Sequence, residues 1–188
     1  MAQYFAQESA VAHFFCSNNK SAVLWLVVRV YLGYEWLIAG WDKVNNPAWV
    51  GDSAGAAITG FVQGALKKTA EFCQPLPAAC HADVQGWYAA FLQNVVLPNS
   101  TVWSYMVAWG EVIIGVALIL GLFVGLSAFF GGFMNLNFLL AGTVSVNPIM
   151  LTLAIFLVLA WRVAGYWGLD RYVLPLISRR VNPQNYHN

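Results

Sequence analysis

Long apolar runs separated by short polar segments dominate the chain. A transmembrane helix needs about 20 mostly apolar residues, and the first such run covers residues 22–41. Residues 102–147 contain a single charge, Glu111, and are too long for one crossing, which indicates two spans over 102–122 and 125–146. A fourth run covers 148–168 and starts with a proline, which the first turn of a helix tolerates. The pattern predicts an all-α, polytopic membrane protein with a four-transmembrane-helix bundle.

The largest segment between the predicted spans is the loop 42–101, and it is patterned. The stretches AAITGFVQGALKK and VQGWYAAFLQNVV place apolar residues at helical spacing on one face. Aromatic residues are enriched at membrane interfaces. We therefore expect two amphipathic helices that lie in the headgroup region, between the first and second spans.

The two ends of the chain differ from this central part. Residues 1–21 carry apolar positions on one helical face and predict a short amphipathic helix on the membrane surface. The first apolar run is too long for a signal-peptide core and predicts a retained span. Residues 22–176 form the predicted membrane domain, and residues 177–188 form a polar tail.

Composition agrees with a membrane protein and excludes one class of partner. The chain is 60% hydrophobic and 9% charged, whereas soluble domains carry about 25% charged residues. The formal net charge is only +1, and its adjacent basic pairs are Lys67–Lys68 and Arg179–Arg180. Basic clusters of this size predict no nucleic-acid partner.

Charged residues inside the predicted spans are the strongest functional signal. A lone charge at the centre of a membrane helix costs about 2.5–3.5 kcal/mol, and such residues often mark a functional path. Two arginines and two glutamates cancel formally, so we expect them to meet across helices. Such pairs can also be purely architectural, and this alternative stays open. The four residues are Arg29, Glu35, Glu111 and Arg162.

Helix phase adds small and polar residues to these charges. On the first span Arg29 shares a stripe with Gly33, Trp36 and Gly40, and on the third span Asn135 shares one with Gly131 and Phe138. Small residues let membrane helices approach closely, and polar side chains then bond between them. An asparagine in such a stripe more often forms hydrogen bonds between helices than acts as a functional group.

The cysteines and histidines carry little chemistry. Cys73 and Cys80 in the large loop lack redox spacing, and a structural disulfide is the favoured interpretation. With His81 they fall short of a closed zinc site, so we predict no metal, and no haem motif is present. A disulfide in this loop favours placing the loop on the oxidising outer side of the membrane. Basic residues are slightly more numerous beside the terminal segments, which favours a cytoplasmic side for the termini. We expect a multi-pass cell-membrane protein with cytoplasmic termini.

Several motifs in order resemble one known family. RVYLGYEWLIAGWDKV, with Arg29 and Lys43, resembles the first helix of the DoxX family. WGEVIIGVALILGLFVGLSAFFGGFMNLNFLLAGT, with Glu111, is similar to its second and third helices, and AGYWGLDRYVLP to its closing segment. The resemblance covers about residues 22–175, nearly the whole chain, although the cysteine-bearing loop lies outside the motifs.

The resemblance implies a redox context. The DoxD branch of the family supplies a membrane subunit to thiosulfate:quinone oxidoreductases, and no redox cofactor is visible in the sequence. Our first hypothesis is therefore a quinone-linked oxidoreductase subunit that works with a redox partner subunit. Its candidate catalytic residues are Glu111, Glu35, Arg29 and Arg162, and its candidate quinone-binding residues are Trp36, Asn135 and Phe138.

Two other classes of function remain open. The amphipathic loop is larger than a minimal bundle needs, which favours a non-enzymatic membrane anchor or assembly partner for a soluble redox protein. A small-solute carrier is less favoured because four spans show no inverted repeat, although a homo-oligomer would supply further helices. Membrane lipids are the expected surroundings in every case.

Overall fold

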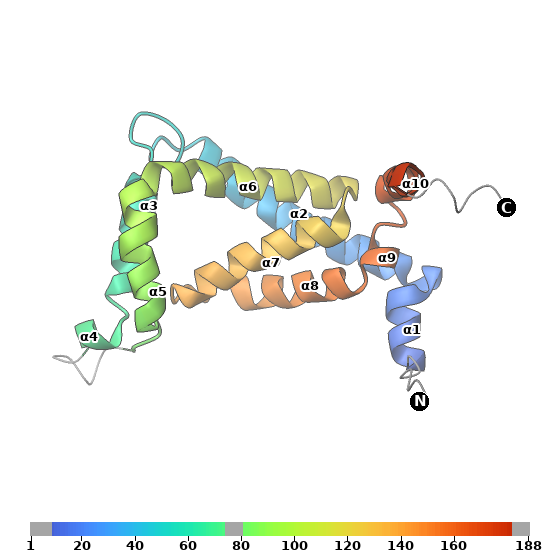
Figure 1. The fold of residues 1–188 in the computed structure, drawn as a ribbon, viewed down its shortest axis with the longest axis horizontal. Helices are drawn as coiled ribbons and strands as arrows, with labels where there is room; N and C mark the ends of the chain where they lie inside the picture. The colour runs from blue at the N-terminus through green and yellow to red at the C-terminus, as the bar shows by residue number, and fades with distance from the viewer. Residues whose placement is uncertain (1–8, 74–80, 182–188) are drawn as a thin grey trace.

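The fold is built from helices that pack along one another. The computed structural model describes residues 9–73 and 81–181, and within these ranges the only β-type pairing is an isolated bridge between Thr69 and Val84. The bundle in Figure 1 consists of the four longest helices. They are α2 (Ala22–Val44), α6 (Ser100–Leu120), α7 (Val124–Leu140) and α8 (Asn147–Leu159).

Shorter helices cover the two ends of this bundle. In Figure 1, α3 and α5 run across one end of the long helices, while α1, α9 and α10 lie at the other end. The short elements are α1 (Ala10–Ser17), η1 (Asn19–Ser21), α3 (Ala56–Leu66), α4 (Ala70–Cys73), α5 (Gly86–Phe91), η2 (Leu92–Val96), η3 (Leu97–Asn99), α9 (Trp161–Ala164) and α10 (Asp170–Val181).

Two helical stretches are long and apolar enough to cross a membrane. One covers Asn19–Val44, with 26 residues, and the other covers Gly86–Leu120, with 35 residues, because α5 continues through a π-turn into α6. The helices in the predicted third and fourth spans are shorter, with 17 and 13 residues. The predicted span 125–146 stops early because the chain turns at Gly142, whose φ is +73°.

The closest packing in the bundle joins α2 to α6. Glycines allow this approach: a Cβ on Gly115 would lie 2.5 Å from the backbone nitrogen of Leu37, and one on Gly40 would lie 2.6 Å from that of Val112. A Cβ on Gly33 would lie 3.0 Å from the carbonyl oxygen of Gly115. The two backbones therefore touch over two turns, as small residues permit in membrane helices.

The amphipathic loop helices turn their apolar faces toward the bundle. Ile58 and Val62 of α3 are buried, as are Tyr88 and Leu92 of α5 and η2, and together they form a second core at the end of the bundle. Trp87, which neighbours Tyr88 in the stretch VQGWYAAFLQNVV, does not join this core, and its side chain is 64% exposed. The loop is thus a packed layer, which we call the α3–α5 layer.

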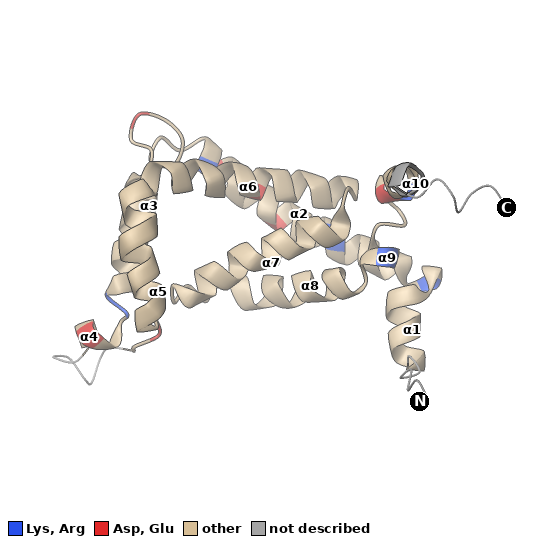
Figure 2. Cartoon of the chain, in the orientation of Figure 1, with Lys and Arg blue, Asp and Glu red and all other residues tan. Residues whose placement is uncertain are grey.

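The C-terminal boundary also differs from the sequence interpretation. The polar tail was predicted to begin at residue 177, yet α10 continues to Val181 with Pro175 inside it. Charges gather near the two ends of the molecule, and Figure 2 shows few of them along the long helices. At the N-terminal end, α1 has no buried residue among Ala10–Ser17.

The α2–α6 contact generates the first prediction. Replacing Gly115 by alanine places a methyl group against the Leu37 backbone, and we expect a loss of about 1–3 kcal/mol in the free energy of unfolding. Gly110→Ala on the same helix is the matched control, because its Cβ would lie 3.7 Å from the Met134 sulfur, an ordinary contact. Denaturation in detergent measures both, and equal stability of the two variants would contradict the close packing.

Candidate functional site

A buried ion pair links α2 to α6. Lys43 Nζ lies 2.6 Å from Glu111 Oε2, and the Glu111 side chain is 1% exposed. Lys43 Nζ also donates to the carbonyl oxygen of Ala39 at 3.3 Å and lies 5.3 Å from the centre of the Trp49 ring. The Lys43 side chain keeps 21% of its surface accessible, so the pair connects a buried carboxylate to the edge of the bundle.

Sequence reasoning did not pair these two residues. It ended the first span at Trp41, whereas α2 continues to Val44 and carries Lys43 in its last turn. A lysine has a long stem that can run along an apolar surface and point its ammonium group elsewhere. The available signal was the position of Lys43 inside the motif RVYLGYEWLIAGWDKV.

Arg29 is buried at the opposite end of the bundle. It is 1% exposed, and Nη2 donates to the carbonyl oxygen of Trp167 at 3.1 Å. Its Nε and Nη1 atoms have no hydrogen-bond partner in the described part of the chain. A Cβ added to Gly121 or Gly168 would collide with the guanidinium group, so these two glycines make room for it.

Asp170 fixes the same end of the bundle through the backbone. Its two carboxylate oxygens accept hydrogen bonds from Phe123 N at 2.6 Å and Val124 N at 2.9 Å, at the start of α7. A carboxylate at a helix N-terminus satisfies free N–H groups and interacts favourably with the helix dipole. Asp170 N also donates to the carbonyl oxygen of Gly121 at 2.8 Å. Asp170 was not among the predicted site residues, although the closing motif AGYWGLDRYVLP contains it.

The predicted meeting of arginines and glutamates does not occur. Glu111 pairs with Lys43, and Arg29 binds a carbonyl oxygen. Arg162 is exposed and its guanidinium carbon lies 5.6 Å from the centre of the Trp161 ring. Glu35 is half-buried. The reason is position: Arg162 falls after the end of α8, in α9, where it reaches the surface.

Further polar side chains lie inside the bundle. Trp36 and Asn135 are 2% and 0% exposed, and Ser104 is fully buried. Trp36 Nε1, both side-chain polar atoms of Asn135 and Ser104 Oγ make no hydrogen bond within the described residues. A Cβ on Gly131 would lie 2.9 Å from Trp36 Nε1, so the indole of α2 packs on α7. The structure thus places Trp36 and Asn135 in the interior, as predicted for interhelical residues.

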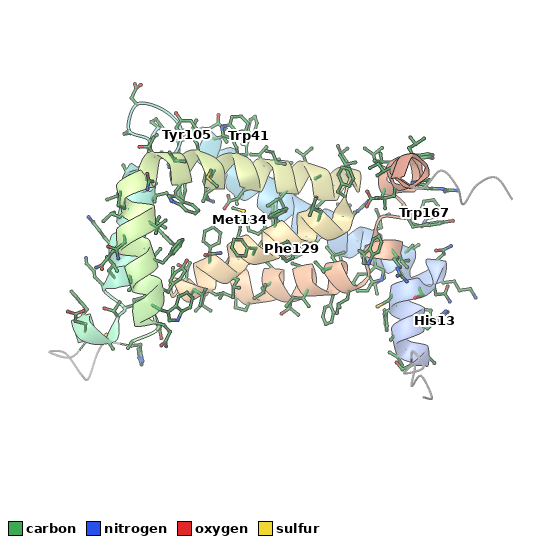
Figure 3. All side chains as sticks on the ribbon, in the orientation of Figure 1. His13, Trp41, Tyr105, Phe129, Met134 and Trp167 are labelled. Carbon is green, nitrogen blue, oxygen red and sulfur yellow. The ribbon has the colours of Figure 1, made fainter. Side chains whose placement is uncertain are left out.

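A cavity with aromatic walls lies between the α3–α5 layer and the bundle. Its empty volume is about 660 Å³, and Met134 at its edge lies between α6 and α7 (Figure 3). We call it the aromatic cavity. It is lined by Ile58, Phe61, Tyr88, Phe91, Leu92, Val96, Trp103, Val107, Phe133, Met134, Asn137 and Phe138.

Two polar groups face this otherwise apolar cavity. Tyr88 Oη donates to Asn137, whose carbonyl oxygen lies at 2.9 Å and whose Oδ1 lies at 3.2 Å. Asn137 Nδ2 donates to the carbonyl oxygen of Phe133 at 2.8 Å. Phe138 lines the cavity and packs edge-to-face on Phe61, with 6.0 Å between the ring centres. Of the three predicted quinone-binding residues, only Phe138 lines the cavity.

The loop cysteine lies at the far side of the α3–α5 layer. Cys73 in α4 is disulfide-bonded and Cys16 in α1 is free. The predicted partner, Cys80, lies outside the described residues. Within the described residues, no group of three or more His, Cys, Asp or Glu side chains has the arrangement of a metal site.

An apolar exterior, long apolar helices and charges neutralised between helices define a helical membrane protein. The chain belongs to the DoxX family: the family model matches residues 24–165, most of its length. The matched range contains Arg29, Lys43 and Glu111 and ends before Asp170. Neither the comparison with curated proteins nor that with solved structures gave a match.

The ion pair generates an asymmetric prediction. Lys43→Met leaves a buried carboxylate without its partner, and we expect the free energy of unfolding to fall by about 2–4 kcal/mol. Glu111→Gln costs less, because Lys43 can turn toward water. The double variant should recover much of the Lys43→Met loss. Denaturant unfolding in detergent measures the cycle, and strictly additive costs would show that the pair is not coupled.

For Asn135 we predict that substitution causes no loss of stability, in contrast to Lys43. Because its amide makes no hydrogen bond within the described chain, Asn135→Leu should leave thermal stability unchanged or raise it. Asn137→Leu is the matched control on the same helix. It removes the side-chain hydrogen bonds with Tyr88 and Phe133, while Tyr88 keeps its bond to the Asn137 backbone carbonyl. The stability should fall by about 0.5–1.5 kcal/mol. A clear loss in Asn135→Leu would mean that this amide is paired.

Proposed function

We propose that this DoxX family protein binds a quinone in the aromatic cavity and acts as the membrane subunit of a quinone-linked oxidoreductase. The single observation that carries the proposal is the position of that cavity beside the buried Lys43–Glu111 pair. Val107 lines the cavity and precedes Glu111 by one turn of α6. An apolar slot and a protonatable carboxylate are thus neighbours on one helix.

The cavity suits the shape and polarity of a quinone head. Small-molecule pockets typically have mostly apolar walls and a few polar groups, and the lining of this cavity has that composition. The rings of Phe61, Phe138 and Trp103 offer flat surfaces for an aromatic or quinoid ring. Tyr88 Oη could donate to a ring oxygen by exchanging its hydrogen bond with Asn137 for one to the quinone. A quinone bound there would take up electrons and protons at its ring oxygens.

Glu111 and Lys43 are the groups that hold a proton near this slot. Lys43 Nζ lies 2.6 Å from Glu111 Oε2, which is within the reach needed for proton transfer between two groups. Because Lys43 remains 21% exposed, it can exchange protons with the aqueous edge while Glu111 stays buried. Electrons would come from a partner subunit or directly from the donor, for which the DoxD resemblance implies thiosulfate.

We further propose that α2, α6, α7 and α8 cross the membrane as four spans with both termini in the cytoplasm. The 17 residues of α7 correspond to about 26 Å, close to the 30 Å hydrocarbon core. The disulfide-bonded Cys73 favours an oxidising outer space for the α3–α5 layer. Basic residues near α9 and α10 favour the inner side.

A second candidate function is a membrane anchor or assembly partner for a soluble redox protein. The observation that favours it is a cleft on the α3–α5 layer whose lining residues are mainly polar or charged. Gln63, Thr69, Glu71 and Gln93 are among its lining residues. Such a surface would suit a water-soluble partner better than lipid.

Quinone retention tests the first candidate. Protein purified in mild detergent should carry about one quinone per chain, measured by extraction and chromatography. Val107→Trp fills part of the cavity, and we expect retention to fall about tenfold, which corresponds to about 1.4 kcal/mol of binding free energy. Val116→Trp is the matched control on α6, because Val116 is 41% exposed and outside the cavity lining.

Equal retention in the two tryptophan variants would contradict binding in this cavity. Full retention with unchanged quinone reduction in Glu111→Gln would contradict the role of the carboxylate. A soluble partner that co-purifies in stoichiometric amount, with no quinone and no turnover, would favour the anchor.

A further inference from the structure

A second apolar groove lies on the outside of the bundle and shares only Phe133 with the lining of the aromatic cavity. It runs between α7 and α8 and consists of two adjoining hollows with empty volumes of about 770 and 710 Å³. Phe129 and Val158 line both hollows, and Phe129 lies on α7 in Figure 3. Small residues, Ala128, Gly132 and Ala154, form its floor. We call this feature the α7–α8 groove.

The length of the groove corresponds to one leaflet of a bilayer. Its lining along α8 and α9 extends from Leu151 to Trp161, ten residues apart, which is about 15 Å at the rise of an α-helix. The hydrocarbon core is about 30 Å thick, so half of it is also about 15 Å. A groove of this length and polarity fits one acyl chain.

One end of the groove carries the features of a headgroup region. Trp161 is 46% exposed and Trp167, beside α9 in Figure 3, is 55% exposed. Exposed tryptophans are typical of the membrane interface. Arg162 follows Trp161 directly, and Arg171 precedes the groove residue Leu174 by one turn of α10. Both arginines are exposed and stacked on aromatic rings.

We propose that the α7–α8 groove binds an anionic phospholipid, with an acyl chain in the groove and the phosphate at Arg162. Arginine binds phosphate oxygens through a planar fork of N–H groups. The Trp161 ring holds the guanidinium group at the mouth, 5.6 Å from the ring centre. The proposal does not depend on quinone binding, because the groove shares only the Phe133 side chain with the aromatic cavity.

The one carboxylate in the groove lining does not oppose an anionic lipid. Asp170 is 4% exposed, and both of its oxygens accept backbone hydrogen bonds from Phe123 and Val124. Its charge is also balanced by the nearby Arg29. The charges that remain accessible at the mouth are therefore positive, which matches a headgroup with a net negative charge.

Native mass spectrometry with defined lipids tests the site. Protein in detergent is mixed with equimolar phosphatidylglycerol and phosphatidylcholine of identical acyl chains, and the retained lipid is counted. We expect phosphatidylglycerol to be retained about tenfold over phosphatidylcholine, and Arg162→Gln to bring this ratio close to one. Lys20→Gln is the matched control, since it removes the same charge in η1, which provides no lining residue.

A second variant tests the acyl-chain part of the site. Val158→Trp blocks the middle of the groove and should lower retention of both lipids several-fold, while Val116→Trp on α6 should not. Thermal unfolding confirms that each variant is folded. Equal retention of the two lipids by the native protein, or equal loss in Lys20→Gln and Arg162→Gln, would overturn the phosphate assignment. Undiminished retention in Val158→Trp would overturn the groove as the site.

Discussion

The close contact between α2 and α6 is the constraint on which the candidate site depends. Without a Cβ at Gly40 and Gly115, the two backbones approach until carbonyl and amide groups touch. This approach places the last turn of α2 beside the middle of α6, so that Lys43 reaches Glu111. A larger residue at either glycine would move α2 outward and lengthen the 2.6 Å ion pair. The ion pair of the candidate site therefore depends on the close packing of α2 against α6.

The buried charges are neutralised in two different ways. Glu111 has a lysine partner whose stem comes from the edge of the bundle, so the desolvation cost falls mainly on the carboxylate. Arg29 has a carbonyl oxygen and the charge of Asp170 nearby, and its role is to join α2 to the segment before α10. Only the first arrangement joins a buried charged group to a partly exposed one. For this reason Glu111 is a stronger candidate than Arg29 for a functional residue.

The sequence predicted where the long helices begin because the signal for them is local, although α7 and α8 end earlier than predicted. Apolar runs, Pro148 at the start of α8 and the glycine stripe of α2 all depend on neighbouring residues. The partners of the charges could not be predicted in the same way, since each depends on where a helix ends. Helix α2 continues for three residues beyond Trp41, to Val44, and this extension places Lys43 beside Glu111. Helix α8 ends at Leu159, so Arg162 lies beyond it at the surface. The cavity depends on the fold of the loop against the bundle, which no periodicity encodes.

The two hollows of the molecule differ in what they can exchange with their surroundings. The aromatic cavity is enclosed by the α3–α5 layer and has hydrogen-bonding groups from Tyr88 and Asn137, so a guest there is oriented by the protein. The α7–α8 groove faces outward and has an apolar floor, so its occupant is held by shape along its length and by charge only at one end. A ring with polar oxygens suits the first and a chain with an anionic head suits the second. Phe133 of α7 lines both hollows, so its side chain would transmit a change in packing from one hollow to the other.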